Sequence, residues 1–304
     1  MPQRPPGQSV ICHLSFVMLR SAIGYWLCAA PSATIHLLVL DLWRNLGLFP
    51  ETDMPDAPTS SVPILMYHRI ATDGPSGLAR WRLAPDLFAA HMEALHRAGY
   101  QTIKLEDWAD AIDQRRPVQG KRIVLTFDDG YSDFLTDAVP LLRRYDFSAT
   151  MFLVAERIGQ TALWDAGFGE PAPLMGWEEI KSLPKEIEFG AHSCTHQKMT
   201  EMAPTDLWED TVKTRKILEQ SLGVLIPTLA YPYGDQNESV RQIVREAGTR
   251  AAVTTESGVS KLGDDLLQLP RIEIGGDCTA EKFNWLMEHD WKEADGQSVG
   301  VESL

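Results

Sequence analysis

The chain reads Lys121-Arg122-Ile123-Val124-Leu125-Thr126-Phe127-Asp128-Asp129-Gly130, an apolar and β-branched run that ends in two adjacent carboxylates and a glycine. Residues 123–127 are typical of a buried strand, because the run is short and a turn signal follows at once. Parallel sheets and (β/α) barrels bind ligands at the carboxyl ends of their strands, where Asp128 and Asp129 are predicted to lie. Neighbouring carboxylates repel each other unless a cation or a shared proton relieves the repulsion. The stretch indicates either a metal site, with one Asp as ligand and the other as base, or an Asp-Asp-Gly turn that closes a strand.

On both sides of this stretch, short strand patterns alternate with helical patterns. Apolar residues recur at helical spacing in residues 86–98, 105–112, 133–145, 177–183, 205–222, 238–247 and 280–288. Strands are predicted at residues 62–68, 100–103, 123–127, 149–154, 187–191, 228–231, 251–254 and 269–272. The alternation predicts a parallel α/β sheet. About eight short strands in roughly 240 residues fit a barrel better than an open sheet.

Composition excludes some classes of protein. The 304 residues are 44% hydrophobic and 23% charged, as in an ordinary globular protein. The formal net charge of −14 argues against a nucleic-acid partner, which requires a basic face. The cysteines are widely spaced and contain no Cys-x-x-Cys pair, so they predict neither a disulfide framework nor a zinc knuckle.

Residues 1–60 differ from the rest of the chain. Two apolar stretches, 9–19 and 21–40, are interrupted by His13, Arg20, Pro31 and His36, whereas a spanning helix needs roughly 20 uninterrupted apolar residues. The segment fits an atypical signal peptide or membrane anchor, which would place the protein in the cell envelope or outside the cell. It equally fits an extension from a misassigned start, which would leave the protein cytoplasmic. Residues 53–63, rich in proline, are predicted as a linker, so residues 61–304 form the predicted folded domain. The oligomeric state is left open.

A second pattern is Phe189-Gly190-Ala191-His192-Ser193-Cys194-Thr195-His196. Two histidines four residues apart, on a helical turn or in a tight loop, can aim both imidazoles at one divalent metal. The alternative is a pair of surface or packing histidines. The position at a strand end favours the metal. Two His and one carboxylate form a recurrent set for a Lewis-acid metal that keeps open positions for water and substrate.

A third pattern, Leu229-Ala230-Tyr231-Pro232-Tyr233-Gly234, ends another predicted strand. It fits a tight loop with packing aromatic side chains. It also fits a rigid loop that presents a backbone N–H to a developing oxyanion.

Together the three patterns resemble the polysaccharide deacetylase superfamily, the NodB-homology domain of metal-dependent carbohydrate N-deacetylases. Residues 126–130 match its first motif, residues 192–196 its second, H-[S/T]-x-x-H, and residues 231–234 its third. The resemblance covers residues 62–275. It implies a distorted (β/α)7 barrel that forms a single catalytic domain, and hydrolysis of the acetamido group of an N-acetylglucosamine-containing oligo- or polysaccharide.

The resemblance also implies roles for individual residues. Asp129, His192 and His196 would bind one divalent metal, usually Zn²⁺, although the same ligands suit Co²⁺, Ni²⁺ or Mn²⁺. Asp128 would be the general base. The backbone N–H of Tyr233 would help to hold the oxyanion.

Two departures from the family pattern concern the base and the acid. The third motif usually begins with an Arg that pairs with the base, but here Ala230 stands in that place; we expect Arg271, at another strand end, to supply the guanidinium. The usual late Leu-x-x-His is matched only by Leu286-Met287-Glu288-His289, in a helical pattern. The poly-β-1,6-N-acetylglucosamine deacetylase branch has its acid histidine near the start, as in Met66-Tyr67-His68-Arg69-Ile70. We therefore expect His68, rather than His289, to be the general acid.

Aromatic residues are candidates for sugar binding. Tyr231, Trp164 and Trp177 are predicted to contact the substrate, although a Trp beside a helix start is more often a packing residue. Two other functions fit the same patterns. One is hydrolysis of a non-carbohydrate C–N bond, such as that of a ureide, imide or acylated amine. The other is carbohydrate binding without catalysis, against which the presence of both aspartates and both metal histidines argues.

Overall fold

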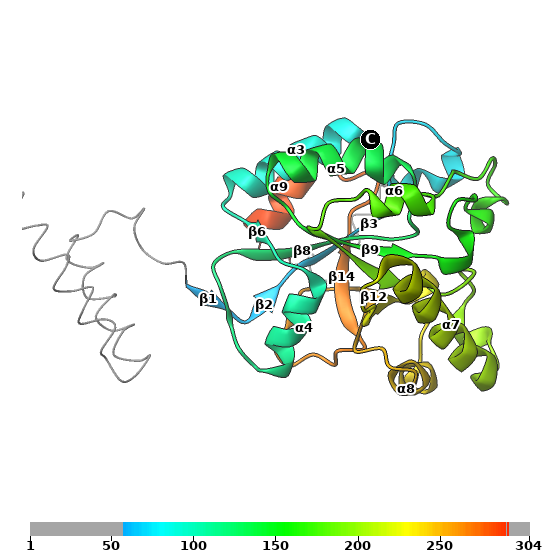
Figure 1. Cartoon of the computed structure of the whole chain (residues 1–304). Helices are drawn as coiled ribbons and strands as arrows, with labels where there is room; N and C mark the ends of the chain where they lie inside the picture. The colour runs from blue at the N-terminus through cyan, green and yellow to red at the C-terminus, as the bar shows by residue number, and fades with distance from the viewer. Residues whose placement is uncertain (1–56, 290, 292–304) are drawn as a thin grey trace, which may run out of the picture. The chain divides into compact units, whose positions relative to one another are not determined.

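The computed structural model describes residues 57–289 and residue 291 (Figure 1). Its centre is a closed barrel of parallel strands, whose order around the ring follows the order along the chain. The ring closes where β3 pairs in parallel with β8, with Ile64 opposite Val124. The strands are β3 (Ile64–Tyr67), β8 (Arg122–Phe127), β9 (Ala149–Leu153), β10 (Ile187–Ala191), β11 (Thr228–Ala230), β12 (Ala251–Ser257) and β14 (Leu269–Glu273). The predicted (β/α)7 barrel is confirmed.

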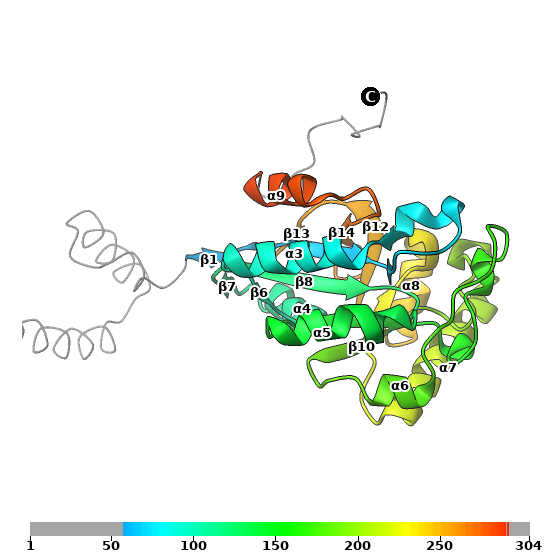
Figure 2. The same ribbon diagram turned by 90° about the horizontal axis from the view of Figure 1, so that it is seen from above.

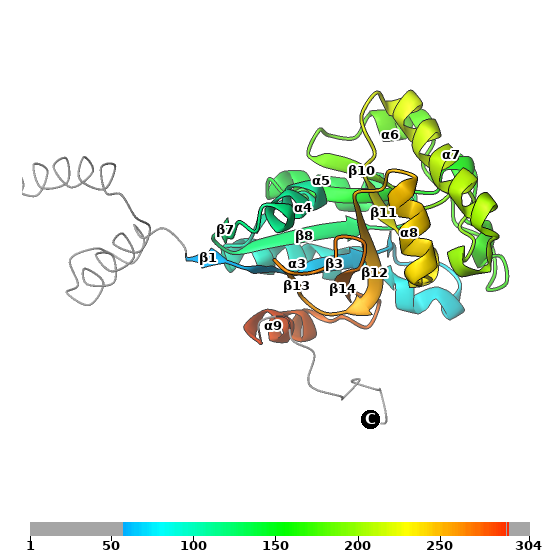
Figure 3. The ribbon, with the colours of Figure 1, turned by 90° about the horizontal axis from the view of Figure 1, so that it is seen from below.

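Helices surround the ring. The helix α3 (Pro85–Arg97) lies between α9 (Ala280–Glu288) and α5 (Val139–Arg144), and it contacts both (Figure 2). The helices α7 (Pro204–Leu222) and α8 (Glu238–Glu246) lie side by side (Figure 3). The shorter helix α6 (Trp177–Lys181) precedes β10. Within the described residues, no helix has the length and hydropathy needed to cross a bilayer.

The barrel strands separate two apolar cores because successive side chains point to opposite faces of a strand. Leu65 and Leu125 belong to the larger cluster, which lies beneath the helices, whereas their neighbours Ile64 and Val124 belong to a second cluster. The second cluster includes Trp108 of α4 (Leu105–Asp113), whose amino end contacts β9 and β10 through Thr150 and Glu188. Since Thr150 and Glu188 stand near the starts of their strands, α4 covers the amino end of the barrel.

Two predicted segments differ in the structure. Part of the predicted linker is β-structure: β1 (Pro58–Thr59) pairs with β7 (Val118–Gln119), and β2 (Ser61–Val62) pairs with β13 (Ser260–Lys261). Proline is tolerated there because these are edge strands. The helix predicted over residues 133–145 begins with a π-helical turn at Phe134–Ala138, in which Val139 N–H bonds the Phe134 carbonyl. Pro140 follows, and it has no N–H to continue a regular ladder.

Smaller strands complete the described part of the chain. The strand β6 (Gln101–Thr102) pairs with the first residues of β8 outside the ring, and β4 (Arg69–Ile70) pairs with β5 (Arg82–Leu83). The signal-like segment predicted at the N-terminus lies outside the described residues.

Glu188 makes stability depend on pH. Its Oε1 accepts hydrogen bonds from Thr150 Oγ1 at 2.6 Å and from Leu105 N–H at 3.0 Å, but burial raises the pKa of its carboxyl from 4.5 to about 7. Between these pH values the folded chain binds more protons than the unfolded chain, so stability falls as pH rises. We expect Glu188→Gln to raise the free energy of unfolding at pH 8 by about 1–3 kcal/mol, with little gain at pH 4.5.

Urea unfolding at both pH values tests this prediction. The control is Glu178→Gln, a carboxylate that is 93% exposed and should show no such pH dependence. An equal effect of Glu188→Gln at the two pH values would contradict the raised pKa of the Glu188 carboxyl.

Candidate active site

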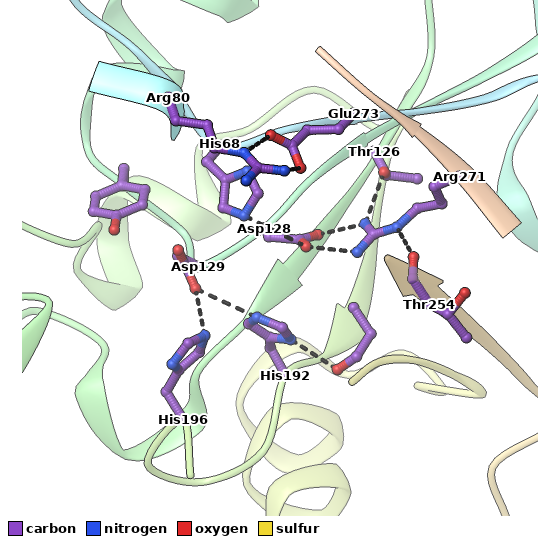
Figure 4. Close-up of polar contacts among 12 residues, drawn as sticks. His68, Arg80, Thr126, Asp128, Asp129, His192, His196, Thr254, Arg271 and Glu273 are labelled. Carbon is purple, nitrogen blue, oxygen red and sulfur yellow. Dashed lines mark hydrogen bonds and ion pairs between the residues drawn. The ribbon is translucent and has the colours of Figure 1, made fainter. Parts of the chain in front are cut away.

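The carboxyl ends of three barrel strands bring the predicted polar residues together (Figure 4). His68 follows β3, Asp128 and Asp129 follow β8, and His192 follows β10. They line one cavity of about 330 Å³. A cavity of this size lies at the lower end of the range for small-molecule sites. The other lining side chains include Leu78, Arg80, Trp81, Tyr131, Trp164, Asp165, Phe168, His196, Tyr231, Tyr233 and Glu273.

Asp129, His192 and His196 form a buried set of possible metal ligands. Their donor atoms all lie within 4.8 Å of one another. Asp129 Oδ1 is 3.4 Å from His192 Nε2 and 3.2 Å from His196 Nε2. Tetrahedral ligands at about 2.0–2.1 Å from Zn²⁺ lie about 3.3 Å apart, so this spacing fits such an ion.

The unmet bonding capacity of Asp129 supports the same fit. Its Oδ1 is buried and has no hydrogen-bond partner among the described residues. Burial would raise the pKa of this carboxyl, but the two histidines outweigh burial and hold the pKa well below its usual range. An ionised, under-satisfied oxygen faced by two imidazoles is the donor set that a divalent cation binds.

Neighbouring groups orient both imidazoles. His192 Nδ1 lies 2.7 Å from the Ala230 carbonyl, so Nδ1 is the protonated nitrogen and Nε2 presents a lone pair. The ring of His196 stacks on Trp164 with centroids 4.4 Å apart and meets the ring of Tyr233 edge-on at 4.5 Å. Ala230 thus contributes its carbonyl at the place where the family pattern has an arginine.

The guanidinium of Arg271 pairs with Asp128 in a bidentate arrangement. Both of its terminal nitrogens lie 2.8 Å from a carboxylate oxygen of Asp128. Arg271 is only 1% exposed, and its remaining donors reach Thr126 Oγ1 at 3.1 Å and the Thr254 carbonyl at 2.9 Å. The structure therefore places an arginine from β14 where the sequence predicted that one was needed.

This pairing keeps Asp128 ionised. Burial would raise the pKa of Asp128, but the charge and hydrogen bonds of Arg271 outweigh burial and lower the pKa below its usual value. Asp128 and Asp129 thus carry two adjacent negative charges that face different partners, Arg271 for Asp128 and the two imidazoles for Asp129. A turn also closes the strand here, since Gly130 N–H donates to the Asp128 carbonyl at 3.0 Å, so the stretch is both a strand-closing turn and a site that buries two carboxylates.

His68 faces the same carboxylate. Its Nε2 lies 4.0 Å from Asp128 Oδ2, and its side chain is 18% exposed. The segment after His68 is held by Asp133, which accepts hydrogen bonds from Arg69 Nε at 2.8 Å and from Ile70 N–H at 3.1 Å. His289, the alternative acid, is exposed at the end of α9 and does not line the cavity.

A model of the polysaccharide deacetylase family matches residues 115–252. Residues 115–252 of the chain are therefore a polysaccharide deacetylase domain. The chain is 26% identical over 230 residues to YxkH of Bacillus subtilis, which is named as a polysaccharide deacetylase, and the match covers 75% of this chain and 77% of that protein.

Two further comparisons concern fold and coverage. The solved structure of the Streptococcus pyogenes deacetylase PplD, in complex with acetate, has a TM-score of 0.65 at 26% identity and covers 76% of this chain and 99% of that one. The poly-β-1,6-N-acetyl-D-glucosamine N-deacetylase of Escherichia coli K12 is 22% identical over 222 residues. That match covers 62% of this chain and 33% of the longer E. coli protein.

The predicted sugar-contacting aromatic residues occupy three different places in the deacetylase domain. Trp164 lies in the cavity, but one face of its ring is covered by His196. Tyr231 is 1% exposed, and its hydroxyl donates to the Leu267 carbonyl at 3.0 Å. Trp177 packs against the larger apolar cluster and lines a separate surface hollow, so it lies outside the cavity that holds the other predicted site residues. Trp177 is the first residue of α6, and its ring packs on the same cluster as that helix.

Tyr233 lies at the mouth of the cavity. Its side chain is 52% exposed, and its backbone takes the left-handed conformation, with φ 60°. Gly234 follows at φ 68°, where a Cβ would come within 2.0 Å of Thr255 Oγ1, so only glycine fits. The loop of the third motif is therefore tightly packed rather than free to move.

Sequence reasoning missed two polar pairs that line the cavity. Arg80 forms a bidentate pair with Glu273 at the cavity rim, with distances of 2.6 and 3.0 Å. Tyr131 donates its hydroxyl to Asp165 at 2.7 Å. Tyr131 directly follows the first motif, so its position signalled a site residue. Arg80 lies in no recognisable pattern and had no such signal.

Removal of Arg271 should leave a buried carboxylate unpaired. We expect Arg271→Ala to lower the free energy of unfolding at pH 7 by about 3–5 kcal/mol. Because the folded pKa of Asp128 is depressed, the contribution of the pair is present above the ordinary value of 3.8 and is lost as pH falls through the folded pKa. The measurement is urea unfolding between pH 3 and pH 8.

The exposed pair Arg80–Glu273 provides the control. The Arg80 side chain is 68% exposed, so Arg80→Ala should cost at most about 1 kcal/mol. A loss as small as this in Arg271→Ala would show that the Arg271–Asp128 pair is not the buried ion pair described.

Proposed function

We propose that the chain is a metal-dependent N-deacetylase that removes acetyl groups from N-acetylglucosamine residues of an oligo- or polysaccharide. The observation that supports this most strongly is the arrangement around one cavity of three side-chain groups: the set Asp129, His192 and His196, the Asp128–Arg271 pair, and His68. The E. coli relative, named as a poly-β-1,6-N-acetyl-D-glucosamine N-deacetylase, supports the choice of substrate.

The metal set and the base divide the chemistry between them. A divalent ion held by Asp129, His192 and His196 would polarise the acetyl carbonyl and lower the pKa of a water molecule. Asp128, kept ionised by Arg271, accepts the proton of the attacking water. Since Arg271 occupies both oxygens of Asp128 from one side, the carboxylate keeps a fixed orientation and its other lone pairs face the cavity.

The leaving amine and the oxyanion need groups of their own. His68, whose Nε2 lies 4.0 Å from Asp128 Oδ2, donates a proton to the sugar nitrogen as the C–N bond breaks. The backbone N–H of Tyr233 donates a hydrogen bond to the oxyanion, a contribution that typically amounts to about 10²–10³ in rate. Each of these steps uses a different side chain or peptide, so single substitutions separate them.

Metal binding and activity should separate at Asp128. We expect the full chain to bind one equivalent of Zn²⁺, and Asp129→Asn, His192→Ala and His196→Ala to lose both metal and activity. Asp128→Asn should retain the metal and lose about 10²–10⁴ in kcat, because only the base is removed. Metal analysis after dialysis, with acetate release measured on the same samples, tests this. Loss of metal from Asp128→Asn would contradict the division of roles.

The identity of the acid is tested by paired histidine variants. We expect His68→Ala to lose about 10²–10⁴ in kcat, whereas His289→Ala, remote from the cavity, should keep wild-type activity. The assay is acetate release from β-1,4- and β-1,6-linked N-acetylglucosamine oligomers. Loss of activity in His289→Ala alone would overturn the assignment of the acid. If no oligomer releases acetate although metal is bound, hydrolysis of a non-carbohydrate C–N bond becomes the better proposal.

A further inference from the structure

The segment that contains both metal-binding histidines is a tight loop in an unusual conformation. Ser193 and His196 both have positive φ angles, 60° and 64°, although neither is glycine. Such conformations persist only where surrounding contacts determine them. Contacts with the rest of the chain must therefore hold this loop.

Part of the loop is held by its own chain and by the segment after β9. The Ser193 hydroxyl accepts the His196 N–H at 2.9 Å. The carbonyls of Ser193 and Cys194 accept N–H groups of Ala155 and Glu156 at 3.1 and 3.0 Å. These contacts hold the loop through its carbonyls and leave the Cys194 N–H to be satisfied from elsewhere.

Asp210 of α7 supplies that partner. Both of its carboxylate oxygens lie within hydrogen-bond distance of Cys194 N–H, at 3.1 and 3.3 Å. The Cys194 thiol lies against the same helical turn, since Thr214 Oγ1 donates to its sulfur at 3.2 Å and the sulfur lies 3.6 Å from the Asp210 carbonyl. Asp210 itself does not line the cavity. It reaches the site only through the loop.

We propose that Asp210 is a positioning residue, whose carboxylate anchors the centre of the loop to α7 so that His192 and His196 both face Asp129 before any metal binds. The effect of Asp210 on metal affinity rests on the proposed metal site. The hydrogen bond between Asp210 and the Cys194 N–H is independent of that proposal. A hydrogen bond from a peptide N–H to a carboxylate is stronger than one to a neutral acceptor. Loss of a residue that orients metal ligands without binding the metal typically lowers metal affinity about 10–100-fold.

The first test is Zn²⁺ affinity, measured by competition with a chromophoric chelator. We expect Asp210→Ala to bind Zn²⁺ about 10–100-fold more weakly than wild type. Asp210→Asn keeps an acceptor oxygen and should remain within about threefold. The matched control is Glu209→Ala, the neighbouring exposed carboxylate on α7, which should bind as wild type does. Wild-type affinity in Asp210→Ala, or equal losses in Asp210→Ala and Glu209→Ala, would overturn the proposal.

A second readout needs no metal. In the metal-free full chain, the amides of residues 192–196 should exchange with solvent faster in Asp210→Ala than in wild type, while the amides of β10 are unchanged. If Asp210→Ala does not fold, Thr214→Val takes its place. This variant removes the α7 hydroxyl that donates to the Cys194 sulfur, and it should show the same local effect to a smaller degree. Unchanged exchange in whichever of the two folds would overturn the proposal. Absence of Zn²⁺ binding by wild type would instead contradict the proposed metal site, and the exchange result would still decide the role of Asp210.

Discussion

The central constraint of this structure is that two adjacent carboxylates are buried at the end of one strand. Asp128 and Asp129 are 3% and 4% exposed, and their negative charges follow each other along the chain. The backbone turns between them, because Asp129 takes φ 76°, so the two side chains face different groups. Asp128 meets a guanidinium, and Asp129 meets two imidazoles that suit a metal. The barrel can bury the pair because it presents separate polar partners to each member, a guanidinium to Asp128 and two imidazoles to Asp129.

That separation depends on the closure of the barrel. Arg271 comes from β14, two strands away from β8 around the ring through β3. In an open sheet with this strand order, β14 and β8 could lie far apart. Only a closed ring brings the guanidinium of one strand and the carboxylate of the other to the same end. The link between fold and chemistry is therefore direct: the ring closure at β3 and β8 allows Asp128 to be ionised inside the protein.

Backbone strain is concentrated at the same end of the barrel. Of the seven non-glycine residues with positive φ in the described part of the chain, four lie at this end of the barrel: Asp129, Ser193, His196 and Tyr233. Each such residue costs of order 1–3 kcal/mol, which the surrounding packing must offset. These four residues belong to the three sequence patterns that led to the site. The strain is a local cost of aiming several side chains and one peptide at a single cavity.

The spacing of apolar residues predicted the strands and most helices. It shows which side chains face the core, and the barrel buries those side chains. The sequence patterns predicted the metal set because the residues lie at strand ends. The sequence predicted that Asp128 needs a basic partner, because Ala230 stands where the family pattern has an arginine. It offered Arg271 only as one candidate at another strand end. The place of Trp177 outside the cavity could not be predicted, because a position beside a loop does not show which way a ring packs. The Asp210 contact could not be predicted, because it joins a helix and a loop through one peptide N–H.

Anomalous diffraction from a crystal of the Zn²⁺-bound chain, collected at the zinc edge, would show which of the two aspartates binds the metal. We expect one peak about 2.0–2.2 Å from an oxygen of Asp129 and from Nε2 of His192 and His196, with Asp128 still bound by Arg271 and outside the metal's ligands. A peak bridged by both Asp128 and Asp129, with Arg271 displaced, would contradict this expectation.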